Sequence, residues 1–339
     1  MRLRRLGFLL VGVLSSAAFA WLALREVSLS KVVASLREAD YGWLLPALVL
    51  TFVAGWLRAL RWRLLFSKPN RVSVADAFGA ISIGLMFNNL LPSRAGEVPR
   101  TFALRRATGF SAFEIAATIV VERVLDVFVL ALTGVMIWPL LPDESWIRAL
   151  GLVCLGLVVG FLATLALVAA LRERLPRLLV RILAALPFIS EQRATGVRQG
   201  VGAGVAILLR PRRLLEAVCL SFAIWIVVGL SAWVLFPAFG LEAGALAAGL
   251  LLVAASFALS IPSSPGAIGV YEASVQASLV AFAVPPSAAL SYALVLHGVN
   301  FFPILLVGAV AALIMGRRAP HRRLVRPPPG GAAADVPRA

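Results

Sequence analysis

The stretch NNLLPSRAGEVPR, residues 88–100, lies between two long apolar runs and carries two arginines and one glutamate. It opens with Asn88 and Asn89, which end the apolar run before it. Pro92 lacks a backbone N–H and Gly96 permits a positive φ, so we expect a helix to break here. Two structures fit the stretch: a helical hairpin that turns within a membrane, or a loop between helices in which an Arg–Glu pair is solvated.

The composition is that of a polytopic membrane protein. Of the 339 residues, 61% are hydrophobic and 14% are charged, against about 45–50% and about 25% in an average soluble domain. The 32 basic and 16 acidic residues give a net charge of +16, and the basic residues gather at the ends of apolar runs. That placement is typical of the cytoplasmic side of a membrane and of contact with anionic head groups. We therefore expect a membrane as partner, and no nucleic acid.

Residue types used in catalysis and metal binding are scarce. Cys154 and Cys219 both lie in apolar runs, and the two histidines are His297 and His321. A disulfide framework and a metal site are therefore not expected. The sequence also lacks a P-loop, a G-x-S-x-G nucleophile motif and an H-E-x-x-H motif. We expect no enzymatic activity, no catalytic residue and no cofactor.

Six apolar segments are long enough to cross a membrane as helices, which takes about 20 residues. The first begins like a secretory signal, but its length of about 19 apolar residues favours an uncleaved helix. No β pattern is evident, and helices satisfy their own backbone groups in lipid. Two further apolar stretches, 74–106 and 243–284, are interrupted. The expected spans are 6–24, 43–65, 112–141, 147–170, 214–237 and 289–315.

Charge placement predicts how the interrupted stretches cross. With the basic N-terminus in the cytoplasm, the second span ends in an arginine-rich segment, 58–71, on the same side. A full span over 74–91 would place the arginines that follow outside, against the positive-inside rule. A hairpin over 74–106 keeps them inside, and a second hairpin over 243–284 then enters from outside.

These assignments place both termini in the cytoplasm. Residues 1–316 are expected to form one transmembrane domain, with an amphipathic cytoplasmic segment at about 171–213. Residues 317–339 are rich in Arg, Pro, Gly and Ala and are expected to form a disordered cytoplasmic tail.

The two predicted hairpins break in the same way, at Pro, Ser and Gly followed by Glu. The breaks read PSRAGE (92–97) and PSSPGAIGVYE (262–272). Opposed, interrupted helices in two halves of a chain indicate a transporter site near the middle of the membrane. The sequence therefore predicts an all-α polytopic membrane protein with about six spanning helices, two opposed re-entrant hairpins and a candidate inverted repeat.

The first hairpin offers side chains for an anionic group. Arg94 and Arg100 suit a phosphate, because a guanidinium donates two hydrogen bonds in a fixed fork. Glu97 would balance an arginine or receive a cationic group. With Asn88 and Asn89, these residues form the first half of the expected substrate site.

The second hairpin offers the other half. Ser263, Ser264 and the backbone at Gly266 suit a phosphate at the start of a half-helix. Glu272 lies on the half-helix that follows. A plain Pro/Gly turn is the alternative interpretation of this stretch.

A set of ionisable residues lies inside later spans. Glu122 and Asp126 are four residues apart and share a helix face, next to Arg123. Ionisable residues within a span are expected to face the protein interior and to pair. This network either holds the first hairpin by salt bridges or carries a proton, and the two roles are compatible. His297 is expected to join it, as a hydrogen-bonded structural residue or as a proton relay.

Residues near the helix ends are expected to anchor the protein at the membrane interface. Arg58 and Arg61 are expected to extend their charged ends toward the interface. Trp43, Trp56 and Trp62 are expected to be interfacial anchors.

The chain resembles the lysylphosphatidylglycerol synthase transmembrane family, also called flippase-like domain proteins, over about residues 5–315. The motifs are RWRLLF (61–66), NNLLPSRAGEVPR, VVERVLD (120–126) and IPSSPGAIGVYE (261–272). In the last motif the family's paired glycine is Gly266-Ala267 here, a change expected to preserve the turn. The family includes the membrane half of the multiple peptide resistance factor, which looks like a translocase for aminoacylated phosphatidylglycerol.

The resemblance implies lipid transport in a bacterial inner membrane. The expected substrate is an anionic or aminoacylated phospholipid or a lipid-linked sugar, moved between leaflets as the two hairpins alternate. One alternative is a lipid-modifying enzyme with Glu97 or Glu122 as general base. Another is a non-transporting, lipid-binding scaffold for a separate lipid-modifying enzyme.

Overall fold

The computed structural model describes residues 2–91, 95–170 and 211–317. Three predictions fall on other residues: the role of Arg94, the amphipathic segment at about 171–213 and the tail at 317–339. Of these, only residues 211–213 and 317 are described, and they belong to helices.

All six expected spans are helices, and no strand occurs in the described part of the chain. The prediction of an all-α membrane protein is therefore confirmed. A short helix, α2 (Leu29–Glu38), follows the first span, and 3-10 turns lie at Tyr41–Trp43, Pro69–Arg71, Trp138–Leu140 and Phe236–Phe239. The six span helices are α1 (Arg2–Leu24), α3 (Leu44–Leu64), α6 (Ala112–Ile137), α7 (Ser145–Ala170), α10 (Pro211–Trp233) and α13 (Pro286–Arg317).

Four of these helices, α3, α7, α10 and α13, are long and apolar enough to cross a membrane, judged by length and composition. Helix α1 and α2 make a fifth if the pair, bent by 81°, counts as one span. Helix α6 is 26 residues long but carries Glu122, Arg123 and Asp126 near its middle. It crosses the same bundle as the others, so its charged residues need partners inside the protein.

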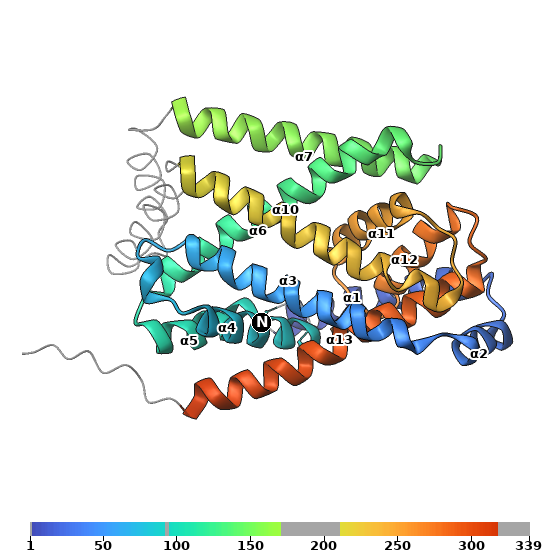
Figure 1. Cartoon of the computed structure of the whole chain (residues 1–339), viewed down its shortest axis with the longest axis horizontal. Coiled ribbons are helices and arrows are strands. Elements are labelled where there is room, and N and C mark those ends of the chain that lie inside the picture. Colours follow the sequence, from blue (N-terminus) through green and yellow to red (C-terminus); the bar gives the residue numbers. More distant parts are fainter. Residues whose placement is uncertain (1, 92–94, 171–210, 318–339) are drawn as a thin grey trace, which may run out of the picture.

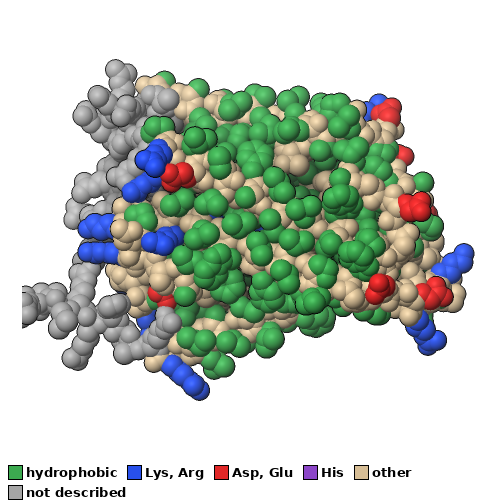
Figure 2. Space-filling view, in the orientation of Figure 1, with side chains coloured by type: hydrophobic (Ala, Val, Ile, Leu, Met, Phe, Trp, Pro, Cys, Tyr) green, Lys and Arg blue, Asp and Glu red, His purple; other side chains and the backbone are tan. Residues whose placement is uncertain are grey.

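Figure 2 shows the outer surface expected of such a bundle. Hydrophobic side chains cover the middle of the visible face, and charged side chains gather at its two ends. Lys and Arg predominate at the end where α3 finishes, whereas the opposite end carries both signs. A broad apolar belt with charged ends fits a protein surrounded by lipid.

Both interrupted stretches form helical hairpins (Figure 1). The first hairpin is α4 (Val74–Leu90) with α5 (Glu97–Thr108). The second is α11 (Ala245–Ala258), the turn η6 (Pro265–Ala267) and α12 (Val270–Val280). They enter the bundle from opposite ends, and α4 contacts η6 where their tips meet.

Close approach makes the first hairpin possible. Gly96 has φ −64°, so the expected positive φ is not the reason for glycine at this position. A Cβ atom on Gly96 would overlap with the carbonyl oxygen of Gly84 on the opposite limb. The amide of Gly96 donates a 2.8 Å hydrogen bond to Asn88 Oδ1, which ties the tip to α4.

The contacts between helices repeat in the two halves of the bundle. Helices α3, α4, α5 and α6 correspond in order to α10, α11, α12 and α13, and α3 packs against α10 in the opposite direction. Helix α4 packs against α13 as α11 packs against α6, and α3 contacts α13 as α10 contacts α6. This exchange of partners is the pattern of an inverted repeat.

Candidate functional site

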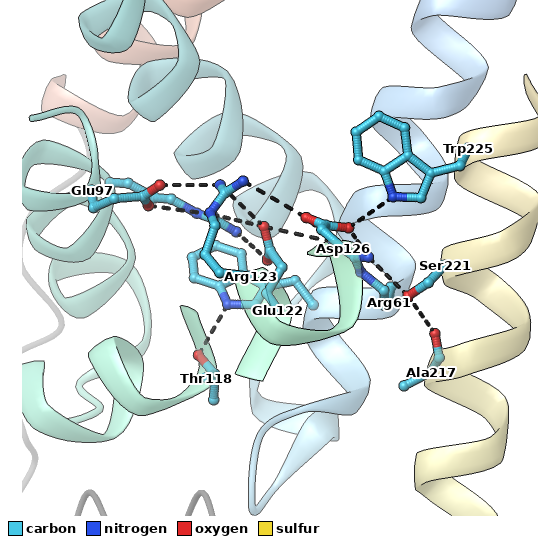
Figure 3. Close-up of polar contacts among 11 residues, drawn as sticks. Arg61, Glu97, Thr118, Glu122, Arg123, Asp126, Ala217, Ser221 and Trp225 are labelled. Carbon is cyan, nitrogen blue, oxygen red and sulfur yellow. Dashed lines mark hydrogen bonds and ion pairs between the residues drawn. The ribbon is translucent and has the colours of Figure 1, made fainter. Parts of the chain in front are cut away.

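An ion network joins α3, α5 and α6 in the middle of the bundle (Figure 3). Arg61 on α3 is fully buried and donates to both carboxylate oxygens of Asp126, at 2.5 and 3.3 Å. Its Nη1 also donates to Ser221 Oγ on α10, at 2.9 Å. A second carboxylate, that of Glu122, lies 3.7 Å from Arg61 Nη2. The charge of Arg61 is therefore compensated by two acidic residues one helical turn apart on α6.

Arg100 ties the first hairpin to the same carboxylates. Its two terminal nitrogens donate to the two oxygens of Glu122, at 3.1 and 2.7 Å. Its guanidinium lies 3.8 Å from the ring centroid of Trp62, within cation–π distance. The Trp62 indole N–H in turn donates to Thr118 Oγ1 at 3.0 Å. Arg100 and Glu122 are each 2% exposed, so this is a bidentate ion pair within the protein.

A second ion pair links the hairpin to α6 nearer the solvent. Arg123 donates to Glu97 Oε1 at 3.0 Å, and its side chain is 49% exposed. The same guanidinium lies 3.5 Å from Glu122 and 3.7 Å from Asp126. The start of α5 is thus fastened to α6 by two arginine–carboxylate contacts, as the salt-bridge interpretation of the sequence predicted.

Helix α10 completes the network through Trp225. The indole N–H of Trp225 donates to Asp126 Oδ1 at 3.2 Å. The Trp225 ring also lies next to Arg58 on α3, whose guanidinium carbon is 5.7 Å from the ring centroid. Trp225 therefore connects the buried carboxylate to an arginine that lines open space.

That open space is a cavity of about 410 Å³ in the middle of the bundle. Its polar wall includes residues of the ion network, and residues at the tips of both hairpins also line it. Apolar residues from the middle of α3, α10 and α13, among them Phe52, Val228 and Ile304, complete the lining. A mostly apolar pocket with a few convergent polar groups is the usual form of a ligand site.

The second hairpin is held by its own polar contacts. Ser264 pairs with Ser16 on α1, with its amide 2.9 Å and its hydroxyl 3.0 Å from Ser16 Oγ. Glu272 accepts from the Gly269 amide at 2.7 Å and lies 2.5 Å from His297 Nδ1 on α13. The His297 ring also packs against Tyr271. His297 therefore belongs to a second polar cluster, separate from the arginine network it was expected to join.

The structure brings most of the predicted site residues to this one cavity. Glu272 is not part of the lining and reaches it through His297. Arg94 lies outside the described residues. The predicted residues that line the cavity are Asn88, Asn89, Glu97, Arg100, Glu122, Arg123, Asp126, Ser263, Ser264, Gly266 and His297.

Four further residues belong to the site although the sequence did not predict it. Arg61 and Trp62, expected at the membrane interface, are fully buried, so that expectation was wrong. Trp43 and Trp56 are exposed, and their role as interfacial anchors stays a prediction. Arg58 lines the cavity, and so does Trp225, for which the sequence made no prediction.

One sequence signal could have found the two arginines. The three-residue spacing of Arg58 and Arg61 puts them on one helix face, which could have linked them to Glu122 and Asp126.

The chemistry available here is recognition of charge. Among the described residues, no group of three or more His, Cys, Asp and Glu side chains is arranged to hold a metal ion. Arginine and carboxylate groups, amides and hydroxyls line the cavity. Such a set suits a polar head group carrying phosphate.

The chain is similar to known membrane proteins over most of its length. Residues 9–308 match the family described as "Lysylphosphatidylglycerol synthase TM region". Two UPF0104 membrane proteins of Methanothermobacter thermautotrophicus are similar throughout. One is 24% identical over 325 residues, covering 91% of this chain and 94% of the relative. The other is 28% identical over 300 residues, covering 83% and 86%.

A third relative is longer than this chain. Glycosyltransferase AglD of Haloferax volcanii is 27% identical over 350 residues, which cover 92% of this chain but 55% of the relative. The similarity therefore concerns about half of that protein.

Proposed function

The chain belongs to the family of lysylphosphatidylglycerol synthase transmembrane regions, and we propose that it moves a lipid with a phosphate-bearing head group between the leaflets of its membrane. The head group would occupy the central cavity while the acyl chains stay in lipid. In this proposal the protein transports and does not itself modify the lipid.

The observation that carries the proposal is the meeting of two broken-helix hairpins around one charged cavity. Residues at the tips of both hairpins line the cavity, the hairpins enter from opposite ends, and their tips are in contact. In the proposed mechanism, movement of one hairpin opens the site to one side of the membrane and movement of the other opens it to the opposite side. The ion network supports this role, because two ion pairs between side chains, Arg100–Glu122 and Arg123–Glu97, connect the first hairpin to α6.

The orientation is part of the proposal. The end rich in Lys and Arg, where α3 finishes and α4 begins, would face the cytoplasm, and both termini would lie there. Two of the relatives come from an archaeon, so we assign the protein to a cytoplasmic membrane, bacterial or archaeal.

Cysteine labelling tests the orientation. In a cysteine-free background, a membrane-impermeant thiol reagent should label Glu26→Cys in intact cells and Arg105→Cys only after lysis. The reverse pattern would overturn this orientation.

A leaflet assay in reconstituted vesicles tests transport. Fluorescent phosphatidylglycerol and its lysyl derivative would be supplied in both leaflets, and an external quencher would measure the fraction that reaches the outside. The proposal predicts protein-dependent exchange of at least one lipid.

The matched variants are Asn88→Leu and Asn70→Leu. Asn88→Leu removes the acceptor that ties the hairpin tip to α4 and should slow exchange. Asn70 is exposed in the turn before α4, so Asn70→Leu should exchange at the wild-type rate. Exchange of neither phospholipid, or equal rates for the two variants, would count against the proposal.

A second candidate rests on the similarity to a protein named as a glycosyltransferase. Here the cargo would be a lipid-linked sugar, used by a separate lipid-modifying or glycosylating enzyme. The same assay distinguishes the two, because a fluorescent polyprenyl phosphate sugar would exchange and phosphatidylglycerol would not. Product formed by the purified protein in detergent, where leaflets do not exist, would instead indicate an enzyme.

A further inference from the structure

The cavity holds one arginine whose charge the described residues leave uncompensated by an ion pair. Arg61 pairs with Asp126 and Glu122, Arg100 with Glu122 and Glu97, and Arg123 with Glu97. Arg58 makes neither a hydrogen bond nor an ion pair with any described residue. Its guanidinium lies over the ring of Trp225 on α10.

Trp225 fixes where that charge lies. Its indole N–H is held by Asp126 at 3.2 Å, and its ring lies under the Arg58 guanidinium, 5.7 Å from centroid to carbon. A cation over an indole face keeps its N–H groups free to donate at the edge of the guanidinium. Arg58 is half-buried and lines the cavity, so those donors face the space that a ligand would fill.

The charges around the cavity can be counted. Three arginines, at 58, 100 and 123, and three carboxylates, those of Glu97, Glu122 and Asp126, line it. Arg61 is fully buried, does not line the cavity and pairs with Asp126 and Glu122, so the arginine network together with Arg58 carries one positive charge in excess. The carboxylate of Glu272 does not line the cavity and is occupied by the Gly269 amide and His297. In a site shielded by lipid, an excess charge favours a ligand of opposite sign.

We infer that Arg58 is the anion-binding residue of the cavity and that its ligand is a lipid phosphodiester with a single negative charge. That the bound lipid is also the transported lipid rests on the proposed function. The sequence predicted Arg94 and Arg100 as the phosphate ligands; Arg94 lies outside the described residues, and Arg100 has both terminal nitrogens on Glu122 and holds the hairpin. The two non-bridging oxygens of a phosphodiester can accept two parallel hydrogen bonds from N–H groups of the Arg58 guanidinium.

Lipid binding can be measured separately from transport. Purified protein in detergent would be titrated with phosphatidylglycerol, which has a phosphodiester, and with diacylglycerol, which has no phosphate. Native mass spectrometry would then read the bound fraction. For Arg58→Gln we expect phosphatidylglycerol binding to weaken by about tenfold or more, the usual effect of losing a charge-assisted hydrogen bond. Binding of diacylglycerol should stay the same.

Two variants control for charge and for folding. Arg58→Lys keeps the positive charge and should retain most of the binding. Arg105→Gln removes one positive charge from the exposed end of α5 and should bind as wild type. Each variant is compared at a matched folded fraction, measured by thermal unfolding, and Arg58→Met replaces Arg58→Gln if the latter does not fold.

Several outcomes would overturn the inference. Wild-type phosphatidylglycerol binding by Arg58→Gln or Arg58→Met is one, and an equal loss in Arg105→Gln is another, since it would reflect surface charge. Displacement of the lipid by millimolar inorganic phosphate would show that the site takes free phosphate rather than a lipid head group. Lipid binding that depends on Arg58, without lipid exchange in vesicles, would support the inference and count against transport. Lipid exchange that does not depend on Arg58 would support transport and count against the inference.

Discussion

Glu122 lies between two arginines that come from different parts of the chain. Arg100 occupies both of its oxygens, and Arg61 lies 3.7 Å away on the opposite side. Removing one partner from a buried ion pair leaves a charge without compensation, which is more costly than removing both. The buried network should therefore behave as a unit, in which the effect of one substitution depends on the others.

A double-mutant cycle on Glu122 and Arg100 tests this dependence. Glu122→Gln should lower the free energy of unfolding by about 3–5 kcal/mol, because Arg100 and Arg61 then share one buried carboxylate fewer. The double variant with Arg100→Gln should lose clearly less than the sum of the two single losses. Thermal or denaturant unfolding in detergent gives the three values.

The exposed pair Arg212–Glu216 on α10 provides the matched control. Glu216→Gln should change stability by no more than about 0.5 kcal/mol, as is usual for solvated pairs. Strictly additive losses at Glu122 and Arg100 would show that the two residues do not act together.

The network also shows what the sequence could and could not predict at this scale. Glu122 and Asp126 were predicted to share a face and to pair, because charged residues four apart in an apolar helix have few other options. Arg61 and Trp62 were misplaced, because an Arg or Trp near the end of a span has the same sequence context whether it turns outward or inward. Their partners include Arg100 and Ser221, which lie on other helices far along the chain, and no local pattern reports such contacts.

At the scale of elements, the hairpins were predicted because their signals are local. Pro, Gly and Ser interrupt each apolar stretch, and the positive-inside rule determines the side of entry. What the sequence did not reveal is how near the limbs approach. Gly84 and Gly96 are far enough apart in sequence that their contact appears only when the hairpin has closed.

Gly96→Ala tests that contact. The added methyl group would overlap with the Gly84 carbonyl oxygen, so the limbs must separate, and we expect a loss of stability of about 1–3 kcal/mol from overpacking. Gly160→Ala in α7 is the control, since nothing lies within 4 Å of its added methyl. That control should be neutral or gain up to about 1 kcal/mol from helix propensity. Equal unfolding midpoints for the two variants would mean that the hairpin limbs are not tightly packed.

The turn of the second hairpin contains a residue under backbone strain. Ala267 has φ +56°, in the left-handed region that disfavours residues with a Cβ, and it directly follows Gly266 at φ +72°. Ala267→Gly should therefore raise the free energy of unfolding, by up to about 1 kcal/mol after the added flexibility of the unfolded chain is counted. The same substitution at Ala254, inside helix α11, should instead destabilise the protein. A loss of stability in Ala267→Gly would contradict the strained turn.

At the scale of the whole molecule, the fold is two similar halves in opposite orientation around a shared cavity. The sequence suggested an inverted repeat from two short motifs, and the contacts between helices extend the repeat to four helices in each half. The arginines and carboxylates of the network lie on α3, α5 and α6, in the first half, whereas Ser264 and the Glu272–His297 pair belong to the second half. The halves are thus alike in their helix contacts but different in their polar residues.

The central claim is that the hairpins must move for a lipid to cross, and a reversible cross-link tests it most directly. Ser16 on α1 and Ser264 at the second hairpin tip have their hydroxyls 3.0 Å apart, close enough for a disulfide after substitution of both by Cys. Lipid exchange would be followed in the same vesicles before oxidation, after oxidation and after reduction, with Ser16→Cys alone as control. We predict that oxidation of the double variant stops exchange and that reduction restores it. Undiminished exchange with the tip cross-linked would contradict the account.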